Sequence, residues 1–208
     1  MLGHYTYDTH SQKGQTHGIL ERTVHEEGNA TKPDCGEFSA RMGWRYVTYI
    51  AGDAAIHFRI EPMAKLPDII YVPDDAGWQQ SAPDWAREHR DAVVACLKGV
   101  HWNRRLNWKE TPGDTVGHSA ADQIRVVPGS LESTKGGQWM ESLCLFNPGQ
   151  QLTPDDARQL WHEAVRSYTE QVKGRVTIYA SGVVPDSVFQ DIELAMLRRL
   201  PGVTLDFK

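Results

Sequence analysis

The dipeptide Gly52-Asp53 separates two runs of alternating residues, and this feature constrains the fold more than any other in the chain. A two-residue loop that begins with Gly suits the type II′ turn of a β-hairpin. The turn also sets the register of the hairpin, in which Val47 pairs with Phe58. One face of the hairpin is then largely apolar, and the other carries the polar set Tyr46, Thr48, His57 and Arg59.

Hydrophobic periodicity and capping residues predict the other elements. Helices are predicted over 81–100, with Ser81 as N-cap and Trp85 facing inward, after Thr153-Pro154, and after Pro185. The helix after Thr153 carries an inward stripe that includes Leu160 and Trp161. Strands are predicted at 19–26, 44–50, 54–61, 69–72, 104–109, 124–127, 138–146, 175–180 and from Val203, with a hairpin turn at Lys135-Gly136-Gly137.

These elements indicate an α+β (or α/β) fold with a mixed, mainly antiparallel sheet and about three helices. The chain has 208 residues, 40% of them hydrophobic and 24% charged, as is typical of a globular protein. We expect two halves of one compact unit. The halves either arose by duplication or are alike only because both begin a helix with a Ser/Thr-Pro-Asp type of sequence. The predicted parts are a flexible N-terminal arm at 1–17, a sheet-rich half with one helix at 18–110, a connector at 111–122, and a strand-helix-strand-helix-strand half at 123–208.

Composition restricts the compartment and the partners. No apolar run is long enough to span a membrane, and the first residues lack the apolar core of a secretory signal. The three cysteines show no metal-binding or disulfide pattern, so we expect reduced thiols, a cytoplasmic location and no cofactor. The net charge of -5 disfavours bulk attraction to nucleic acid.

Two patterns raise the possibility of an enzyme. The run Gly117-His118-Ser119-Ala120-Ala121 resembles the GHSxG nucleophile elbow of α/β-hydrolases, although Ala121 replaces the last Gly. The elbow needs a buried strand before it and a helix after it, whereas this run lies in the predicted connector. His4, Asp8 and His10 offer metal-ligand chemistry, but they lie in the polar arm, where a solvated segment with incidental His is the simpler interpretation. A small hydrolase or a metal-dependent enzyme using His is therefore the alternative function.

A basic, aromatic-rich run occupies residues 98–109 and contains Trp102, Arg104, Arg105 and Trp108. Cations and flat rings suit a nucleic-acid groove. The same residues also suit the end of a helix followed by packed aromatic side chains, and this second interpretation is favoured.

The main hypothesis is a protein-binding module that covers its partner with an exposed sheet face or an acidic surface. As a compact, acidic, Trp-rich α+β chain with an early hairpin sheet, it resembles the immunity proteins that neutralise toxins in bacterial competition. This resemblance involves no defined motif. The expected partner of the chain is another protein, with no membrane partner. The candidate binding residues are Tyr46, His57, Arg59, Trp78, Trp102, Arg104, Arg105 and Trp108.

Overall fold

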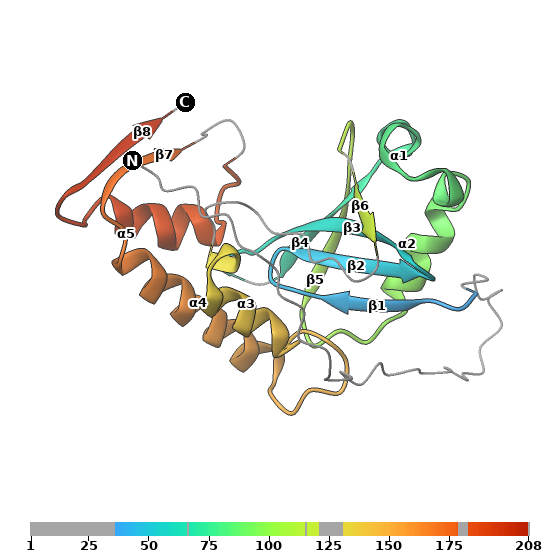
Figure 1. The fold of residues 1–208 in the computed structure, drawn as a ribbon, viewed down its shortest axis with the longest axis horizontal. Coiled ribbons are helices and arrows are strands. Elements are labelled where there is room, and N and C mark those ends of the chain that lie inside the picture. Colours follow the sequence, from blue (N-terminus) through green and yellow to red (C-terminus); the bar gives the residue numbers. More distant parts are fainter. Residues whose placement is uncertain (1–35, 66, 115, 121–130, 179–182, 208) are drawn as a thin grey trace. The chain divides into compact units, whose positions relative to one another are not determined.

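The computed structural model describes residues 36–65, 67–114, 116–120, 131–178 and 183–207 (Figure 1). The predicted strands at 19–26 and 124–127, the arm at 1–17 and the candidate ligands His4, Asp8 and His10 lie outside the described residues. The elements are, in chain order, β1 (Ser39–Met42), β2 (Tyr46–Ala51), β3 (Ala54–Glu61), β4 (Asp68–Pro73), α1 (Asp75–Ser81), η1 (Asp84–Ala86), α2 (Arg90–Lys98), β5 (Leu106–Thr111), β6 (Gly117–Ala120), η2 (Leu131–Ser133), α3 (Lys135–Ser142), α4 (Pro154–Glu170), β7 (Gly174–Ile178), η4 (Phe189–Leu194), α5 (Ala195–Leu197) and β8 (Val203–Phe207).

The main sheet has six strands in the order β1-β2-β3-β4-β5, and β6 also pairs with β3. All its pairings are antiparallel except that of β4 with β5. A mixed sheet with helices confirms the α+β class, although the described residues form five α-helices rather than about three.

The hairpin of β2 and β3 has the predicted register. Val47 pairs with Phe58, and Ala51 pairs with Ala54 next to the turn. Gly52 has a φ of +56°, a left-handed conformation that glycine adopts at little cost. The apolar face of the hairpin is buried in the core, as the alternation of residues predicted.

Two neighbouring parallel strands need a long crossover connection, usually a helical one. The segment between β4 and β5 provides it and contains α1, η1 and α2. The single helix predicted over 81–100 is wrong. Asp74 caps α1 by accepting a hydrogen bond from the Gly77 N–H at 2.8 Å, and Ser81 ends that helix rather than starting one. Trp85, which was predicted to face inward, is 41% exposed.

Two further predictions fail between residues 111 and 146. Part of the predicted connector is strand β6, which pairs with the central strand β3. The predicted strand over 138–146 is largely helix α3, and Lys135-Gly136-Gly137 forms the first turn of that helix rather than a hairpin turn. The signal that was missed is Thr134, whose hydroxyl accepts a hydrogen bond from the Gly137 N–H at 3.0 Å.

The helix predicted after Thr153 is confirmed as α4. The Thr153 hydroxyl caps it by accepting a hydrogen bond from the Asp156 N–H at 3.2 Å, and Pro154 occupies its first turn. Trp161 is buried as predicted, whereas Leu160 is 45% exposed. The predicted strands at 175–180 and from Val203 correspond to β7 and β8, which form a separate two-stranded parallel sheet.

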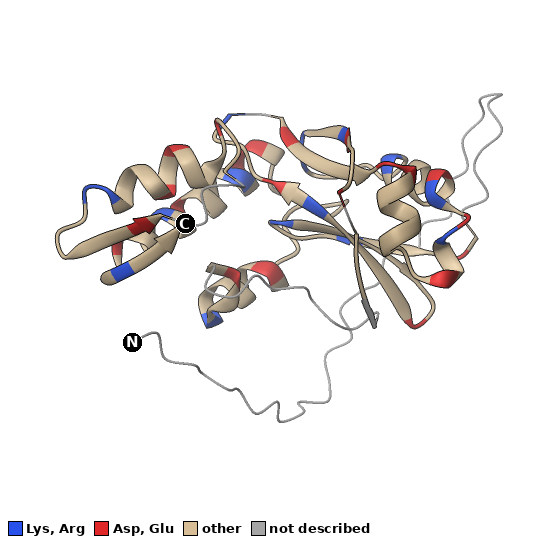
Figure 2. Cartoon of the chain, turned by 90° about the horizontal axis from the view of Figure 1, so that it is seen from above, with Lys and Arg blue, Asp and Glu red and all other residues tan. Residues whose placement is uncertain are grey.

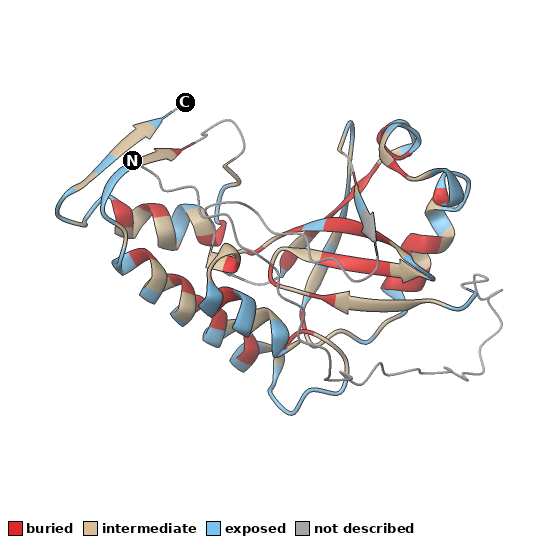
Figure 3. Ribbon diagram, viewed as in Figure 1, coloured by how far each residue is buried: buried red, intermediate tan, exposed pale blue. Residues whose placement is uncertain are grey.

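One hydrophobic cluster joins the sheet to the helices. Figure 3 shows in red that both the strands of the sheet and the helices contribute buried residues. Trp44 stacks on Trp161 with ring centroids 5.2 Å apart, and Phe58 stacks on Trp78 at 6.0 Å. These four rings are fully or almost fully buried, so three of the seven Trp residues belong to the core. Large buried aromatic side chains thus dominate the contacts between the sheet, α1 and α4.

The cysteines differ from one another. Cys96 is disulfide-bonded. Cys144 is a free thiol. The prediction of reduced thiols is therefore wrong for Cys96, and the support that it gave to a cytoplasmic location is removed. Among the described residues, none of the helices combines the length and hydrophobicity needed to cross a bilayer.

Candidate functional site

The polar face of the β2–β3 hairpin brings together three of the candidate binding residues. Tyr46 pairs with Arg59, and Thr48 pairs with His57. The Thr48 hydroxyl lies 3.0 Å from Nδ1 of His57, and the Tyr46 ring meets the His57 ring edge-on at 6.5 Å. His57 is only 2% exposed, so its ring is not presented to a partner or substrate in solvent. Its contacts suit a role in holding β2 to β3.

Arg59 is the accessible member of this face. Its side chain is 47% exposed and lies 3.7 Å from the Asp114 carboxylate. The guanidinium also lies 4.3 Å above the centre of the Tyr71 ring, within the range of a cation–π contact. Burial raises the pKa of Tyr71 above its ordinary value, and the charge of Glu61 raises it further.

Asp68 and Arg104 form a fully buried ion pair between β4 and the start of β5. Arg104 Nε donates to Asp68 Oδ2 at 2.8 Å, and both side chains are at most 1% exposed. The second carboxylate oxygen of Asp68 accepts a hydrogen bond from the Met63 N–H at 2.7 Å. Arg158, from α4, approaches the same oxygen at 3.9 Å. The negative charge of Asp68 thereby offsets the positive charges of Arg104, next to β5, and Arg158, on α4.

The other side of Arg104 holds the backbone before β2. Its Nη1 donates to the carbonyl oxygens of Gly43 and Trp44, both at 2.9 Å. Its guanidinium lies 5.0 Å from the Trp44 ring centre and 4.5 Å from that of Phe146. Arg104 is thus a buried structural residue, and it is withdrawn from the surface that the basic run 98–109 was expected to offer.

Two titratable side chains contact Trp44 from different helices. Glu141, on α3, accepts a hydrogen bond from the Trp44 N–H at 2.8 Å. Burial raises the pKa of Glu141 to about 7. His162, on α4, meets the Trp44 ring edge-on at 5.8 Å. Burial lowers the pKa of His162 to about 4, and the charges of Arg158 and Arg166 lower it further. Perturbed pKa values occur at active sites, but they also occur in structural clusters such as this one.

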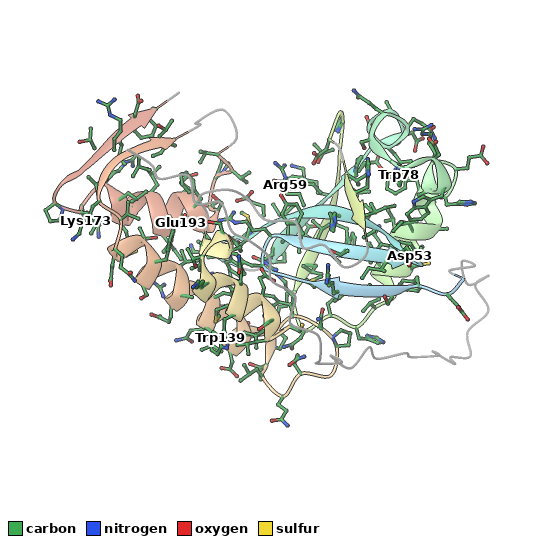
Figure 4. All side chains as sticks on the ribbon, viewed as in Figure 1. Asp53, Arg59, Trp78, Trp139, Lys173 and Glu193 are labelled. Carbon is green, nitrogen blue, oxygen red and sulfur yellow. The ribbon has the colours of Figure 1, made fainter. Side chains whose placement is uncertain are left out.

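A second charged cluster surrounds Arg45. Its Nε donates to Glu132 Oε1 at 2.9 Å, and its Nη2 donates to Glu193 Oε1 at 3.4 Å (Figure 4 labels Glu193). Burial raises the pKa of Glu193 and also that of Glu61, although the charge of Arg45 lowers both. Arg45 thus ties the start of β2 to η2 and η4, which lie far apart in the sequence.

The remaining members of the basic run do not act together. Arg105 is exposed and lies 3.1 Å from the Asp155 carboxylate. Trp102 is half-buried and donates from Nε1 to the Leu97 carbonyl oxygen at 2.9 Å, while Lys98 lies over the Trp108 ring at 5.8 Å. Basic and acidic residues are both spread over the described ribbon (Figure 2). The run is therefore divided between core contacts and paired surface charges.

Trp78 and Ser119 also lie in places that differ from their candidate roles. Trp78 is completely buried and donates from Nε1 to the Ala86 carbonyl oxygen at 3.2 Å, so it cannot anchor an interface. Ser119 lies within strand β6, whereas a nucleophile elbow places its Ser at a turn between a strand and a helix. Within the described residues, no group of His, Cys, Asp and Glu has the arrangement of a metal site.

The most exposed large apolar side chain among the described residues is Trp139, on α3, with 61% of its surface accessible (Figure 4). Leu143 follows four residues later and is 37% exposed, so the two side chains share one face of the helix. We did not predict this face, because residues 138–146 were assigned to a strand. The signal that could have found it is the Thr134 cap, which fixes the helical phase of Trp139.

Comparison with known proteins adds no relative. The chain matches no family model, no curated protein and no solved structure. The class that its coordinates define is an α+β protein with a six-stranded mixed sheet.

Proposed function

We propose that this chain is a protein-binding module that holds its partner through the exposed face of α3. The observation that carries the proposal is the 61% exposure of Trp139. Trp is strongly enriched among the residues that supply most of the binding energy at protein interfaces. Its large apolar ring gains most when a partner removes it from water.

A second apolar side chain extends this surface. Leu143 is exposed and follows Trp139 by four residues, so the two lie on the same face of α3. Contiguous exposed apolar side chains mark interaction sites, whereas single ones are ordinary on protein surfaces. Leu152, before α4, and Leu160, on α4, are further exposed apolar side chains in this part of the sequence.

The helix that carries Trp139 is held firmly from its other side. Gly137 lies so close to the backbone of Leu131 and Glu132 that no Cβ would fit there. Glu141 is bonded to the Trp44 backbone, and Met140 packs against the core. The exposure of Trp139 therefore belongs to an ordered helix, and a rigid anchor loses little conformational entropy when it binds.

An immunity protein that occludes a toxin is the specific form of this function that we propose. The chain carries a net charge of -5, which favours fast association with a basic partner.

The test is affinity capture from the source cell with the wild-type chain, the variant Trp139→Ala and the control variant Trp85→Ala. Trp85 is also an exposed Trp, at 41%, but it lies in η1 and stacks against Tyr49. We expect a stoichiometric partner with the wild type and with Trp85→Ala. Trp139→Ala should weaken the affinity by roughly 30-fold or more, as for a central Trp of an interface.

The affinity is then measured by calorimetry with the purified partner. Trp139→Ala should unfold at nearly the wild-type temperature, since exposed substitutions change stability by about 0.5 kcal/mol or less. Trp85→Ala should cost about 0.5–1.5 kcal/mol more, because it loses the stacking on Tyr49, so both affinities are measured at a temperature where each variant is folded. The proposal is wrong if no stoichiometric protein is captured while its partner is expressed, or if Trp139→Ala binds as well as Trp85→Ala.

A further inference from the structure

The two-stranded sheet of β7 and β8 is incomplete as a folding unit. Among the described residues it contains only five residue pairs, from Gly174 with Val203 to Ile178 with Phe207, and each of its strands has one neighbour. Parallel sheets are ordinarily larger and covered, and two isolated strands are marginally stable. A further strand at one of the two edges would extend the ladder.

The hydrogen-bonding pattern shows which backbone groups face that outer edge. The Gly174 N–H donates to the Gly202 carbonyl oxygen at 3.1 Å, and Gly174 is paired with Val203. In a parallel ladder, the residues whose N–H and C=O groups face the neighbouring strand alternate. Thr204 and Asp206 therefore face β7 with their backbone groups. Those of Val203, Leu205 and Phe207 point to the outer edge of β8.

The outer edges of β1, β5 and β7 carry features that oppose strand pairing and that the outer edge of β8 lacks. On β1, the Met42 N–H is already bonded to Oδ1 of Asn147 at 2.6 Å. On β5, Lys109 and Glu110 are exposed, and charged side chains of this kind protect an edge from pairing. On β7, the outward residue Arg175 is exposed and charged. By contrast, the three β8 residues whose backbone groups point to the outer edge, Val203, Leu205 and Phe207, are all apolar.

We infer that β8 pairs with β8 of a second copy of this chain, antiparallel and about a two-fold axis at Leu205. In this register Leu205 lies opposite Leu205 of the second copy, and Val203 lies opposite Phe207. All three outward residues then meet as hydrogen-bonded pairs, because their backbone groups already point to that edge. The result is a continuous four-stranded sheet with an isologous interface, in which each copy offers the same surface.

The side chains fit this register on both faces of the sheet. Val203, Leu205 and Phe207 alternate along one face, so their apolar side chains gather across the two-fold axis. Phe207 is 50% exposed in the single chain and is covered in the pair. On the other face, Thr204 lies opposite Asp206 of the second copy, so the register avoids a direct contact of like charges.

The pairing of Thr204 with Asp206 of the second copy can be tested by placing either a negative or a positive charge at position 204. Thr204 is exposed, but its partner in the β7–β8 ladder is Arg175, so both substitutions are made and compared in an Arg175→Gln background that removes this charge from the single chain. Thr204→Asp sets a second carboxylate opposite Asp206 in both halves of the dimer, and Thr204→Lys sets a cation there. Sedimentation equilibrium over a wide range of protein concentrations should show a monomer–dimer equilibrium for the wild type. We expect dimerisation about fivefold weaker for Thr204→Asp and about fivefold stronger for Thr204→Lys.

Cysteine cross-linking tests the register itself. In the proposed pair the two copies of residue 205 have Cα atoms about 5.5 Å apart, a distance that a disulfide spans. The two copies of residue 204 are about 8 Å apart, which is too far. Leu205→Cys should therefore yield a covalent dimer on oxidation. Thr204→Cys should give only the background level of the wild type, which also carries the free thiol of Cys144.

Each outcome decides the proposal. A wild-type chain that stays monomeric at every concentration overturns it. So does a dimer that responds equally to Thr204→Asp and Thr204→Lys, or one that Leu205→Cys fails to cross-link while Thr204→Cys succeeds. Circular dichroism of each variant shows that β8 is still folded. These substitutions lie outside α3, so the test is independent of the capture experiment with Trp139.

Discussion

The pH dependence of stability should contain two opposite contributions from the side chains that contact Trp44. Burial raises the pKa of Glu141 from 4.5 to about 7. Between these values the folded chain holds a proton that the unfolded chain has lost, so the free energy of unfolding falls as the pH rises. At about 1.4 kcal/mol for each pKa unit, the loss between pH 4.5 and pH 7 is about 3 kcal/mol.

His162 acts in the other direction. Burial lowers its pKa from 6.5 to about 4, so the unfolded chain binds a proton in this interval and the folded chain does not. The free energy of unfolding therefore rises with pH between about 4 and 6.5, also by about 3 kcal/mol. The two contributions nearly cancel in the wild type.

Two variants separate these contributions. Glu141→Gln keeps an oxygen that can accept the hydrogen bond from the Trp44 N–H but removes the titration. His162→Gln removes the other titration. Urea unfolding at a series of pH values from 4 to 8, followed by Trp fluorescence, gives the free energy of unfolding of each variant. Its difference from the wild type removes the contributions of all other groups.

The stability of Glu141→Gln relative to the wild type should rise by about 3 kcal/mol between pH 4.5 and pH 7. That of His162→Gln should fall by about as much between pH 4 and pH 6.5, because the wild type gains stability there. The double variant is the control, and its two contributions should offset each other to within their coupling. Differences that do not vary with pH, or that have the same sign for both variants, would refute the reasoning.

Two further predictions concern single contacts, each with a neighbouring control. Arg104→Met should lower the free energy of unfolding by about 3–5 kcal/mol, because it removes the nearer of the two cations from the buried carboxylate of Asp68 and leaves only Arg158, at 3.9 Å. Arg105→Met removes an exposed ion pair and should cost about 1 kcal/mol or less; equal costs in urea unfolding would contradict this assignment. Gly137→Ala should cost at least about 2 kcal/mol, because its Cβ would meet the backbone of η2. Gly136→Ala places its Cβ in ordinary contact with the Thr134 hydroxyl, at 3.8 Å, and should stabilise α3 by about 0.5–1 kcal/mol, so thermal unfolding must rank the two in this order.

Local signals in the sequence predicted the elements that are determined locally. Gly52-Asp53 specifies a turn, and the turn specifies every pair of the β2–β3 hairpin. Thr153 and Pro154 specify the start of α4 in the same way. These residues act on neighbours within a few positions, so no knowledge of the rest of the fold is needed.

The failures occur where distant contacts or competing signals decide. Ser81 has the chemistry of an N-cap, but its hydroxyl donates to the Gly77 carbonyl oxygen and so closes α1. Residues 138–146 are apolar enough for a strand, yet the Thr134 cap and the bond from Trp44 to Glu141 stabilise a helix.

The candidate site was predicted only in part for the same reason. The hairpin register placed Tyr46, His57 and Arg59 on one face, but it gave no information on how deeply His57 is buried. Arg104 reads as one cation of a basic run, and only the parallel pairing of β4 with β5 brings it to Asp68. The exposure of Trp139 could not be predicted, because the sequence pattern over 138–146 predicts a strand whereas Trp139 lies on helix α3.

The contacts of Arg45 also have a consequence for the timing of synthesis. Its two carboxylate partners are Glu132 and Glu193, and the second lies 148 positions later in the chain. At about 5–20 residues per second, a ribosome needs roughly 7 to 30 s to reach Glu193 after it has added Arg45. The β2–β3 hairpin can form within microseconds of its own completion. A hairpin that forms early therefore precedes Glu132 by 87 positions and Glu193 by 148, so Arg45 can complete both of its ion pairs only when nearly the whole chain has been made.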